Sequence, residues 1–402
     1  MKKVVLAFSG GLGTNASLHL LKRRFGSNVI TFTANLGQKS STEDLCERAT
    51  ALGAASAHIA DLRERFACQY IWPAIRAGAV CESGYALAHA LARPLIVAEL
   101  VKIAREEGAQ FIAHGCAGKS NDQVRFEVSA AALAPDLQVL SPLRDNDLLR
   151  LDELVAYCDE HNLPSRTDQG CRFSITENLM GTSLQWDRAP DTFDAVPDAV
   201  YRHTRPLSET PNEPQEVLLS FQGGTPTAID GEALAPMPLV ERLAKIAGAH
   251  GVGRVTAVED RLIGIKMIEV YEQPAATTIH TARRALERLV LPPDLQETKT
   301  VLSRRYADLA YQGFWFSELR ESLDAFFTRS TEFVTGDVRL RLYKGSCEVT
   351  GLRSRYSLYN QGLADPTSGG DLFTHGGVRG YMDTLSQPLR RKGGWQPKEA
   401  EV

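Results

Sequence analysis

A glycine-rich segment near the N-terminus has the residue types that bind phosphate. After the apolar residues 4–6 it reads Ala7-Phe8-Ser9-Gly10-Gly11-Leu12-Gly13-Thr14-Asn15 and enters a helical pattern over residues 16–25. Backbone N–H groups at a helix N-terminus bind phosphate, and adjacent glycines let a ligand approach without Cβ clashes. The Ser9 and Thr14 hydroxyls add donors. The segment therefore predicts a phosphate-binding loop, and the alternative is an ordinary strand-to-helix turn with a serine cap.

A second polar segment follows another apolar run at residues 110–114. It begins His114-Gly115-Cys116-Ala117-Gly118-Lys119-Ser120 and continues Asn121-Asp122-Gln123-Val124-Arg125-Phe126-Glu127. Gly-Lys-Ser ends a Walker A loop, but such a loop needs glycine at position 113, where this chain has alanine, so a P-loop kinase is disfavoured. A solvated loop is the remaining alternative. Two phosphate-compatible loops after two strands favour one nucleotide-binding cleft.

Strand-like and helix-like patterns alternate through the first 165 residues and would bring the two segments together. The expected strands cover residues 4–8, 29–34, 56–60 and 110–114, and the expected helices cover residues 16–25, 42–52 and 86–107. This alternation predicts parallel strands joined by right-handed crossovers, hence a doubly wound α/β sheet. Ligands bind such sheets at the carboxyl ends of the strands, so we expect the site in the loops after Phe8, Ala34 and His114.

The rest of the chain lacks this alternation. A hairpin is expected at residues 215–229, followed by a helix over residues 238–249 and a loop at residues 250–254. We therefore expect three parts: a nucleotide-binding domain at residues 1–165, an α+β substrate domain at residues 166–362 and a C-terminal arm at residues 363–402. The arm carries an amphipathic fragment at residues 381–389 and is interpreted as an oligomer contact.

Composition limits the partners of the chain. Its net charge of −4 gives no general attraction for nucleic acid or an anionic membrane surface. No apolar run approaches the roughly 20 residues that span a bilayer, and the N-terminal run is too short for a signal peptide. The seven cysteines are scattered without a C-x-x-C pair, which predicts reduced thiols in the cytoplasm, no disulfide scaffold and no zinc site. Small molecules are the expected partners.

Several blocks of the chain, in the same order, resemble the argininosuccinate synthetase family. Ser9-Gly10-Gly11-Leu12 is similar to the loop of enzymes that split ATP into AMP and pyrophosphate. Further blocks are Ala34-Asn35-Leu36-Gly37-Gln38, Trp72-Pro73-Ala74-Ile75, Leu91-Ala92-Arg93-Pro94, Asn121 to Glu127, Glu177-Asn178-Leu179, His250 to Arg254 and Gly313-Phe314-Trp315. The resemblance covers residues 3–360 and fades in the C-terminal arm. Many blocks in register are more specific than one short motif.

The resemblance implies a two-step ligation that uses ATP and Mg²⁺. In the family, the ureido oxygen of citrulline attacks the α-phosphorus of ATP, which gives a citrullyl adenylate and pyrophosphate. The α-amine of aspartate then displaces AMP and forms argininosuccinate, a step of arginine biosynthesis. Positioning and electrostatic stabilisation carry most of this chemistry, so no catalytic nucleophile is expected. The family also implies a homotetramer, held partly by the C-terminal arm.

The resemblance also implies binding residues at matching positions. The ATP positions are Ala7, Phe8, Ser9, Gly10, Gly11, Leu12, Gly13, Thr14, Asn15, Ala34 and Gly115. The citrulline positions are Tyr85, Arg125, Ser174, Ser183, Glu259 and Tyr271. The aspartate positions are Ala117, Asn121 and Asp122. Singly, each has a structural alternative: Ser174 could cap a helix, and Tyr271 could be a half-buried strand residue. No metal-binding side chain is predicted.

Departures from the family pattern leave alternatives open. Gly13 and Asn15 stand where the family loop has Asp and Ser, and Gly13 is expected to make the turn more mobile. The Asn15 amide is still expected to hydrogen-bond phosphate. His89, Ala90 and Ala117 replace family hydroxyl residues that contact the two amino acids. The leading hypothesis is the family reaction. The alternatives are a divergent paralogue that uses another amine or acceptor, and a non-catalytic ligand-binding relative.

Overall fold

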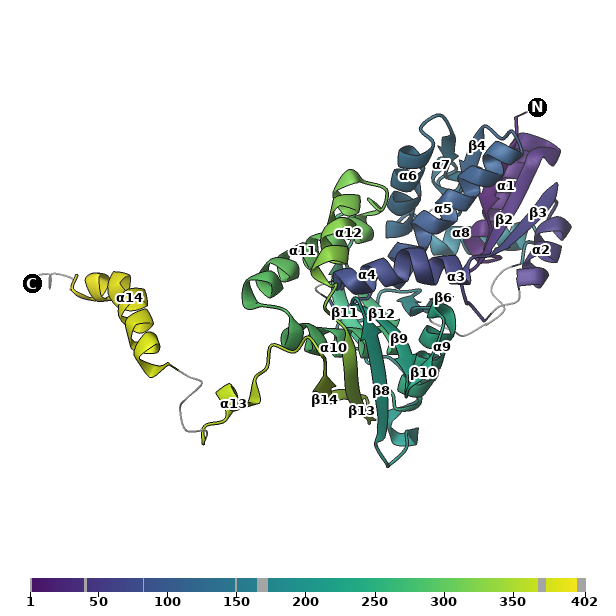
Figure 1. Ribbon diagram of the computed structural model, residues 1–402. Helices are drawn as coiled ribbons and strands as arrows, with labels where there is room; N and C mark the ends of the chain where they lie inside the picture. The colour runs from purple at the N-terminus through teal and green to yellow at the C-terminus, as the bar shows by residue number, and fades with distance from the viewer. Residues whose placement is uncertain are drawn as a thin grey trace, which may run out of the picture. The chain divides into compact units, whose positions relative to one another are not determined.

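The computed structural model describes residues 2–39, 42–81, 83–148, 150–164, 173–367 and 374–395. The chain divides into two compact units, Met1–Tyr356 and Ser357–Val402. The first unit holds three sheets and the helices that cover them (Figure 1). The predicted boundary at residues 165 and 166 lies outside the described residues. It stays a prediction, as does the boundary at residues 362 and 363.

The first sheet is five-stranded and fully parallel. Its spatial order is β3-β2-β1-β4-β5, with bounds β1 Val4–Ala7, β2 Val29–Asn35, β3 Ser56–Asp61, β4 Phe111–Ala113 and β5 Gln138–Leu140. Its helices and turns are α1 Leu12–Phe25, η1 Gly26–Asn28, α2 Thr42–Ala51, α3 Arg63–Phe66, η2 Ala67–Ile71, α4 Trp72–Ala77, α5 Ala88–Glu106, α6 Asn121–Leu133, α7 Pro142–Asp145 and α8 Leu151–Glu160. The predicted doubly wound α/β class is confirmed. The short strand β5 was not expected.

The central strand β1 is apolar on both faces because both faces are covered. Val4, Val5 and Leu6 have no exposed surface. Val5 belongs to the large core that contains α5, whereas Val4 and Leu6 pack into a second core with residues of α1. Continuous apolar runs of this kind are typical of buried parallel strands. β1 lies between β2 and β4, so the strand order reverses its direction at β1. In an open α/β sheet, ligands bind at such a switch point, in the crevice outside the carboxyl ends of the two strands, here β1 and β4.

The second sheet is antiparallel, and its register decides which side chains meet. Its order is β11-β12-β7-β6, with bounds β6 Phe173–Asn178, β7 Gly181–Trp186, β11 Arg254–Asp260 and β12 Lys266–Glu272. Tyr271 pairs with Ser183 on one side and Val255 on the other, and Ser183 pairs with Thr176. Directly paired residues share a face, as do alternate residues along a strand. Ser174, Ser183, Tyr271 and Glu259 therefore lie on one face of this sheet.

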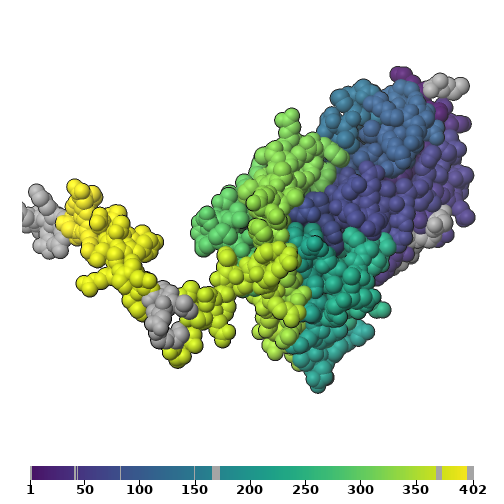
Figure 2. Space-filling view, in the orientation of Figure 1, coloured from purple at the N-terminus to yellow at the C-terminus, as the bar shows by residue number. Residues whose placement is uncertain are grey.

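The third sheet and its helices complete the first unit. Its order is β10-β9-β8-β13-β14, with bounds β8 Gln215–Gln222, β9 Thr225–Ile229, β10 Glu232–Ala233, β13 Gly336–Tyr343 and β14 Ser346–Arg353. The remaining elements are η3 Asp198–Val200, η4 Leu207–Glu209, α9 Pro236–Ala249, α10 Pro274–Val290, α11 Pro293–Gln312 and α12 Glu318–Ser330. The hairpin expected at residues 215–229 is β8–β9. In Figure 2 the purple-to-blue surface of the N-terminal residues lies directly against the teal and green surface of the later ones.

The second unit contains α13 Gln361–Ala364 and α14 His375–Gly393. The amphipathic fragment expected at residues 381–389 lies within α14. Tyr381, Met382, Leu385 and Leu389 are all exposed on this helix. No described helix of either unit is long and apolar enough to cross a membrane.

Candidate active site

The predicted phosphate loop joins β1 to α1 at the crevice position. Gly10 has a φ of +70°, which favours glycine, and Gly11 is the N-terminal cap of α1. The Thr14 hydroxyl donates to the Gly11 carbonyl at 3.0 Å and lies 3.4 Å from the Ser9 hydroxyl. The first N–H groups of a helix lack partners within the helix, so they are available as phosphate donors.

The backbones of Gly13 and Gly115 touch, which joins the two predicted loops. A Cβ atom at position 13 would lie 2.6 Å from the Gly115 carbonyl oxygen, and one at position 115 would lie 2.8 Å from the Gly13 carbonyl oxygen. Real Cβ atoms essentially never come this close to backbone. The missing side chain at position 13 therefore allows close packing of the loops after β1 and β4, which differs from the mobile turn expected from the sequence.

Asn15 has a structural role in this loop. Its side chain is 1% exposed, and its amide Nδ2 donates to the Gly10 carbonyl at 3.2 Å and to the Pro164 carbonyl at 2.9 Å. The expectation that this amide hydrogen-bonds phosphate does not agree with the geometry, because both of its donors face protein carbonyl groups. Asn15 instead connects the loop to the segment after α8.

The other predicted ATP positions lie at the same edge of the first sheet. Ala7 pairs with Phe32 at the end of β1, and the Phe8 carbonyl accepts the Thr33 hydroxyl at 2.9 Å. Ala34 is near the end of β2, and its carbonyl accepts the Gln38 amide at 2.7 Å. These contacts fix the strand ends and bring Ala7, Phe8, Ala34 and Gly115 to the crevice.

A partly buried carboxylate between two guanidinium groups forms the centre of the predicted amino-acid site. Asp122 Oδ2 lies 2.7 Å from Arg93 Nη2, and Asp122 Oδ1 lies 2.9 Å from Arg125 Nη1. Burial alone would raise the pKa of Asp122, but the two arginines hold it well below its ordinary value. The three groups together carry one net positive charge.

A second carboxylate, Glu259, completes the charged part of this site. It is 6% exposed, and it accepts the Ser83 hydroxyl at 2.8 Å and the Tyr311 hydroxyl at 3.1 Å. Tyr311 also accepts the Asn121 amide at 2.7 Å and contacts Arg125. The predicted residues Arg125, Asn121 and Glu259 are therefore joined through one tyrosine.

Two predicted tyrosines form a wall beside these charges. The rings of Tyr85 and Tyr271 stack with centroids 4.1 Å apart. The Tyr85 hydroxyl accepts the backbone N–H of His89 at 2.7 Å, and this N–H in the first turn of α5 has no partner within the helix. Leu87, the residue before α5, has a φ of +63°. Burial raises the pKa of Tyr85, which therefore stays protonated at neutral pH.

The remaining predicted residues are placed differently. Ser183 lies beside Tyr271 in the register of the second sheet. Ser174 is exposed near the start of β6, where its hydroxyl donates to Asp187 at 3.2 Å. Ala117 is exposed in the loop before α6, and its methyl group cannot replace a hydroxyl donor. The network around Asp122 and Tyr311 thus contains most, but not all, of the predicted amino-acid residues.

Four residues of this network were not predicted as binding residues: Ser83, His89, Arg93 and Tyr311. Arg93 stands within the block Leu91 to Pro94, and Tyr311 stands two residues before the block that begins at Gly313. His89 is 6% exposed, and burial, with Arg93 adding to its effect and Asp122 opposing it, lowers the pKa of His89 to about 3. His89 is therefore a neutral side chain next to the charged centre.

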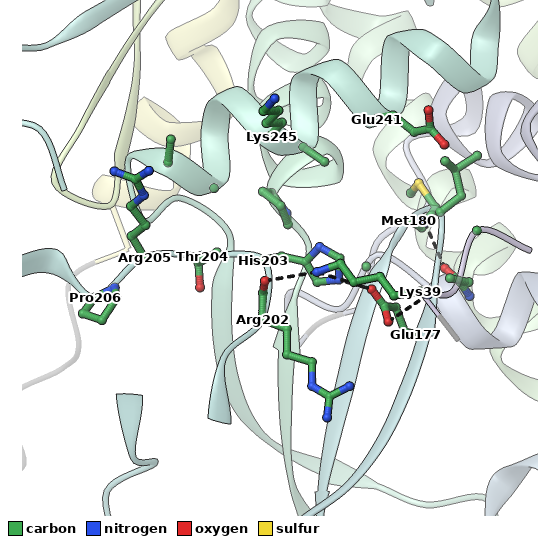
Figure 3. Close-up of a pocket in the computed structure, with 18 residues that line it drawn as sticks. Lys39, Glu177, Met180, Arg202, His203, Thr204, Arg205, Pro206, Glu241 and Lys245 are labelled. Atoms are coloured by element: carbon green, nitrogen blue, oxygen red, sulfur yellow. Dashed lines mark hydrogen bonds and ion pairs between the residues drawn. The ribbon is translucent and has the colours of Figure 1, made fainter. Parts of the chain in front are cut away.

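A pocket of about 600 Å³ lies between the β6–β7 turn and α9 (Figure 3). Glu177 Oε1 lies 2.8 Å from His203 Nε2 and 3.9 Å from Lys39 Nζ, and Lys245 and Glu241 project from α9. None of the described lining residues is a predicted ATP, citrulline or aspartate position. This pocket is therefore distinct from the predicted site.

The parallel sheet, with a phosphate-compatible loop at its switch point, defines a nucleotide-binding protein of the α/β class. Comparisons with known proteins agree with this class. The model of the arginosuccinate synthase N-terminal HUP domain matches residues 3–164, and the model of the arginosuccinate synthase C-terminal domain matches residues 173–390. The chain belongs to the argininosuccinate synthase family.

Curated relatives match the chain over almost its whole length. The argininosuccinate synthase of Symbiobacterium thermophilum is 43% identical over 390 residues, which are 97% of each chain. Those of Chlorobium chlorochromatii and Dehalococcoides mccartyi are each 42% identical, over 97% and 96% of this chain and 97% of their own. A solved NH3-dependent NAD synthetase from Campylobacter jejuni covers 40% of this chain and 64% of its own at 14% identity, with a TM-score of 0.29, too low to define a fold.

We predict that Gly13→Ala destabilises the protein by about 1–3 kcal/mol, because the added methyl group meets the Gly115 carbonyl. Gly11→Ala is the matched control, since its Cβ would have only the Ser9 hydroxyl within 4 Å, at 3.6 Å. The measurement is the free energy of unfolding in urea for both variants. Equal values for the two would contradict the close packing of the loops.

We also predict that His89 makes stability depend on pH. Unfolded His89 protonates below its ordinary pKa of 6.5, whereas folded His89 stays neutral down to about pH 3. The folded state therefore loses stability as the pH falls below 6.5, by up to about 1.4 kcal/mol per pH unit from this residue.

His89→Thr should flatten the dependence of the unfolding free energy on pH between 6.5 and 5. His161→Gln, at a partly exposed histidine, is the comparison variant. If the unfolding free energy of His89→Thr changes with pH as steeply as that of the wild type, the assignment of a neutral, buried state to His89 is wrong.

Proposed function

We propose that this chain is an ATP-dependent C–N ligase that joins citrulline to the α-amine of aspartate and releases AMP and pyrophosphate. Its membership of the argininosuccinate synthase family supports this activity. The main observation in support is a pair of opposite charges that both contact Tyr311. Arg93, Asp122 and Arg125 form a cluster with one net positive charge, and its Arg125 lies over the Tyr311 ring. The carboxylate of Glu259 accepts the Tyr311 hydroxyl. A zwitterionic amino acid carries the complementary pair of charges.

The charged side chains keep bonding capacity for such a ligand. Arg125 has five N–H donors, of which Nε binds the Tyr311 carbonyl and one Nη1 hydrogen binds Asp122. The other donors suit a substrate carboxylate. Glu259 has about four lone-pair positions, of which Ser83 and Tyr311 use two. The others suit an α-ammonium group or a ureido N–H.

For the nucleotide, we propose the edge formed by residues 7–14, Ala34 and Gly115. The N–H groups at the start of α1 and the Ser9 hydroxyl are donors suited to phosphate oxygens, whereas the Thr14 hydroxyl donates to the Gly11 carbonyl. No group of three His, Cys, Asp or Glu side chains among the described residues is arranged to hold a metal ion. We propose that Mg²⁺ enters with its phosphate and water ligands as Mg-ATP, as is usual for this ion.

The proposed chemistry requires two displacements. The citrulline ureido oxygen forms a bond to the α-phosphorus while the bond from that phosphorus to the bridging oxygen breaks, and pyrophosphate leaves. The aspartate nitrogen then bonds to the activated ureido carbon, AMP leaves with the former ureido oxygen, and the nitrogen loses its extra proton. The protein contributes by holding both amino acids beside the nucleotide in the correct geometry.

A second candidate is the same first step with a different amine. His89 and Ala117 favour it, because they remove hydroxyl groups that the family resemblance places at the amino-acid substrates. His89 adds a larger, neutral ring next to Asp122. A site that loses partners for substrate polar groups changes its discrimination strongly.

We further propose a cytoplasmic location and a homo-oligomer, by resemblance a tetramer. None of the described cysteines forms a disulfide bond, which suits a reducing compartment. The exposed apolar side chains of α14 suit a contact with a second copy of the chain. The same resemblance supports the division into a nucleotide-binding domain, a synthetase domain and an arm.

The direct test is pyrophosphate release from Mg-ATP with citrulline alone, aspartate alone, both, and neither. We expect release with citrulline and argininosuccinate formation only with both, detected by mass spectrometry. Release with other amines but not aspartate would select the second candidate. No release and no ATP binding by calorimetry would leave only a non-catalytic relative.

We predict that Glu259→Gln raises the KM for citrulline about 10- to 100-fold, which corresponds to about 1.5–3 kcal/mol for a lost charge-assisted hydrogen bond. Asp260→Asn is the matched control on the same strand. Its side chain is 78% exposed and pairs with Lys266. Comparable KM values for the two variants would rule out contact between Glu259 and citrulline.

A further inference from the structure

Tyr311 contacts three residues that the sequence assigns to two different substrates. Its hydroxyl accepts the Asn121 amide at 2.7 Å and donates to Glu259 Oε2 at 3.1 Å. Its carbonyl accepts Arg125 Nε at 2.8 Å, and its ring lies 4.8 Å from the centre of the Arg125 guanidinium group. Asn121 is an expected aspartate residue, whereas Arg125 and Glu259 are expected citrulline residues.

The hydroxyl acts as donor and acceptor at once, and this fixes its neighbours. Asn121 uses Nδ2 toward Tyr311 and Oδ1 to accept the Leu262 backbone N–H at 2.9 Å, so its amide has one orientation. Burial raises the pKa of Tyr311, so the phenol keeps its proton for Glu259 at neutral pH. Without this hydroxyl, Asn121 and Glu259 each lose a partner.

The end of α11 is built to bring Tyr311 against α6. Gly313 has a φ of +88° and ends the helix in the left-handed conformation. A Cβ atom at position 313 would lie 2.8 Å from the Arg125 Cα atom. The backbone after Tyr311 therefore packs directly on the turn of α6 that carries Asn121, Asp122 and Arg125.

We infer that Tyr311 is a positioning residue that couples the citrulline and aspartate subsites, by holding Glu259 and Arg125 for one substrate and Asn121 for the other. This inference rests on the proposed function. It assigns no bond-making role to Tyr311. Because one side chain orients groups of both subsites, its loss should affect both amino acids together and leave the nucleotide edge unaffected.

The test is Tyr311→Phe, which keeps the ring over Arg125 and removes only the hydroxyl. We expect the KM values for citrulline and for aspartate each to rise about tenfold, as the loss of oriented hydrogen bonds implies, with the KM for ATP changed less than twofold. Tyr311→Leu, which also removes the ring, should raise both amino-acid KM values further.

Tyr306→Phe is the matched control on the same helix. Tyr306 is fully buried, and its hydroxyl donates to Asp324 at 2.8 Å, away from the predicted substrate residues. Removal of the hydroxyl from a tyrosine with a purely structural role should lower the thermal midpoint of unfolding without changing any KM. We therefore expect Tyr306→Phe to lower the thermal midpoint of unfolding at unchanged KM values, whereas Tyr311→Phe should raise the KM values for both amino acids.

The outcomes separate this inference from the proposed function. If the wild type makes argininosuccinate and Tyr311→Phe keeps both amino-acid KM values, or changes only the thermal midpoint, the coupling role is wrong. A rise for one amino acid alone would also overturn the coupling. If the wild type makes no argininosuccinate and binds neither amino acid by calorimetry, the proposed function fails and the role of Tyr311 fails with it.

Discussion

The two ion pairs that the partly buried carboxylate of Asp122 makes with Arg93 and Arg125 are the interactions on which the predicted site depends. Two guanidinium groups brought out of water near each other would repel, and Asp122 makes their joint burial possible by bonding to both. Arg93 belongs to α5 and Arg125 to α6, so the same carboxylate also joins two helices that cover the first sheet. The remaining positive charge then lies beside the sheet face that carries Glu259 and Tyr271, where strand register rather than sequence proximity aligns the groups.

The sequence predicted the fold of the first 165 residues because alternating buried strands and amphipathic helices leave a local pattern. It also located the crevice, since loops after parallel strands must meet at one edge. It missed β5, which has the same length as the fully buried β4 but begins with an exposed glutamine and so leaves no apolar run. The Asn15 expectation failed because the partner of its amide, the Pro164 carbonyl, is 149 residues away along the chain. Tyr311 and Arg93 were missed for the same reason, because their roles arise only from contacts between distant elements.

The site combines rigid and variable parts. Tyr85 and Tyr271 stack, and each is tied to an element of the core, so the wall of the predicted citrulline side has little freedom to move. The charged network does not require a particular side chain at position 89 or at position 117, because none of its hydrogen bonds depends on the residue type there. Changes of substrate within such a site are easier at these two positions than at Asp122, where either arginine would be left without its counter-charge.

The contact between Gly13 and Gly115 also constrains how this loop can evolve. With the two backbones this close, any side chain at position 13 meets a carbonyl group at 2.6 Å. A residue with a Cβ atom there requires the loops after β1 and β4 to separate, so it depends on substitutions elsewhere. The tolerance of position 13 is therefore epistatic: the rest of the two loops, and not position 13 alone, decides which residues it can accept.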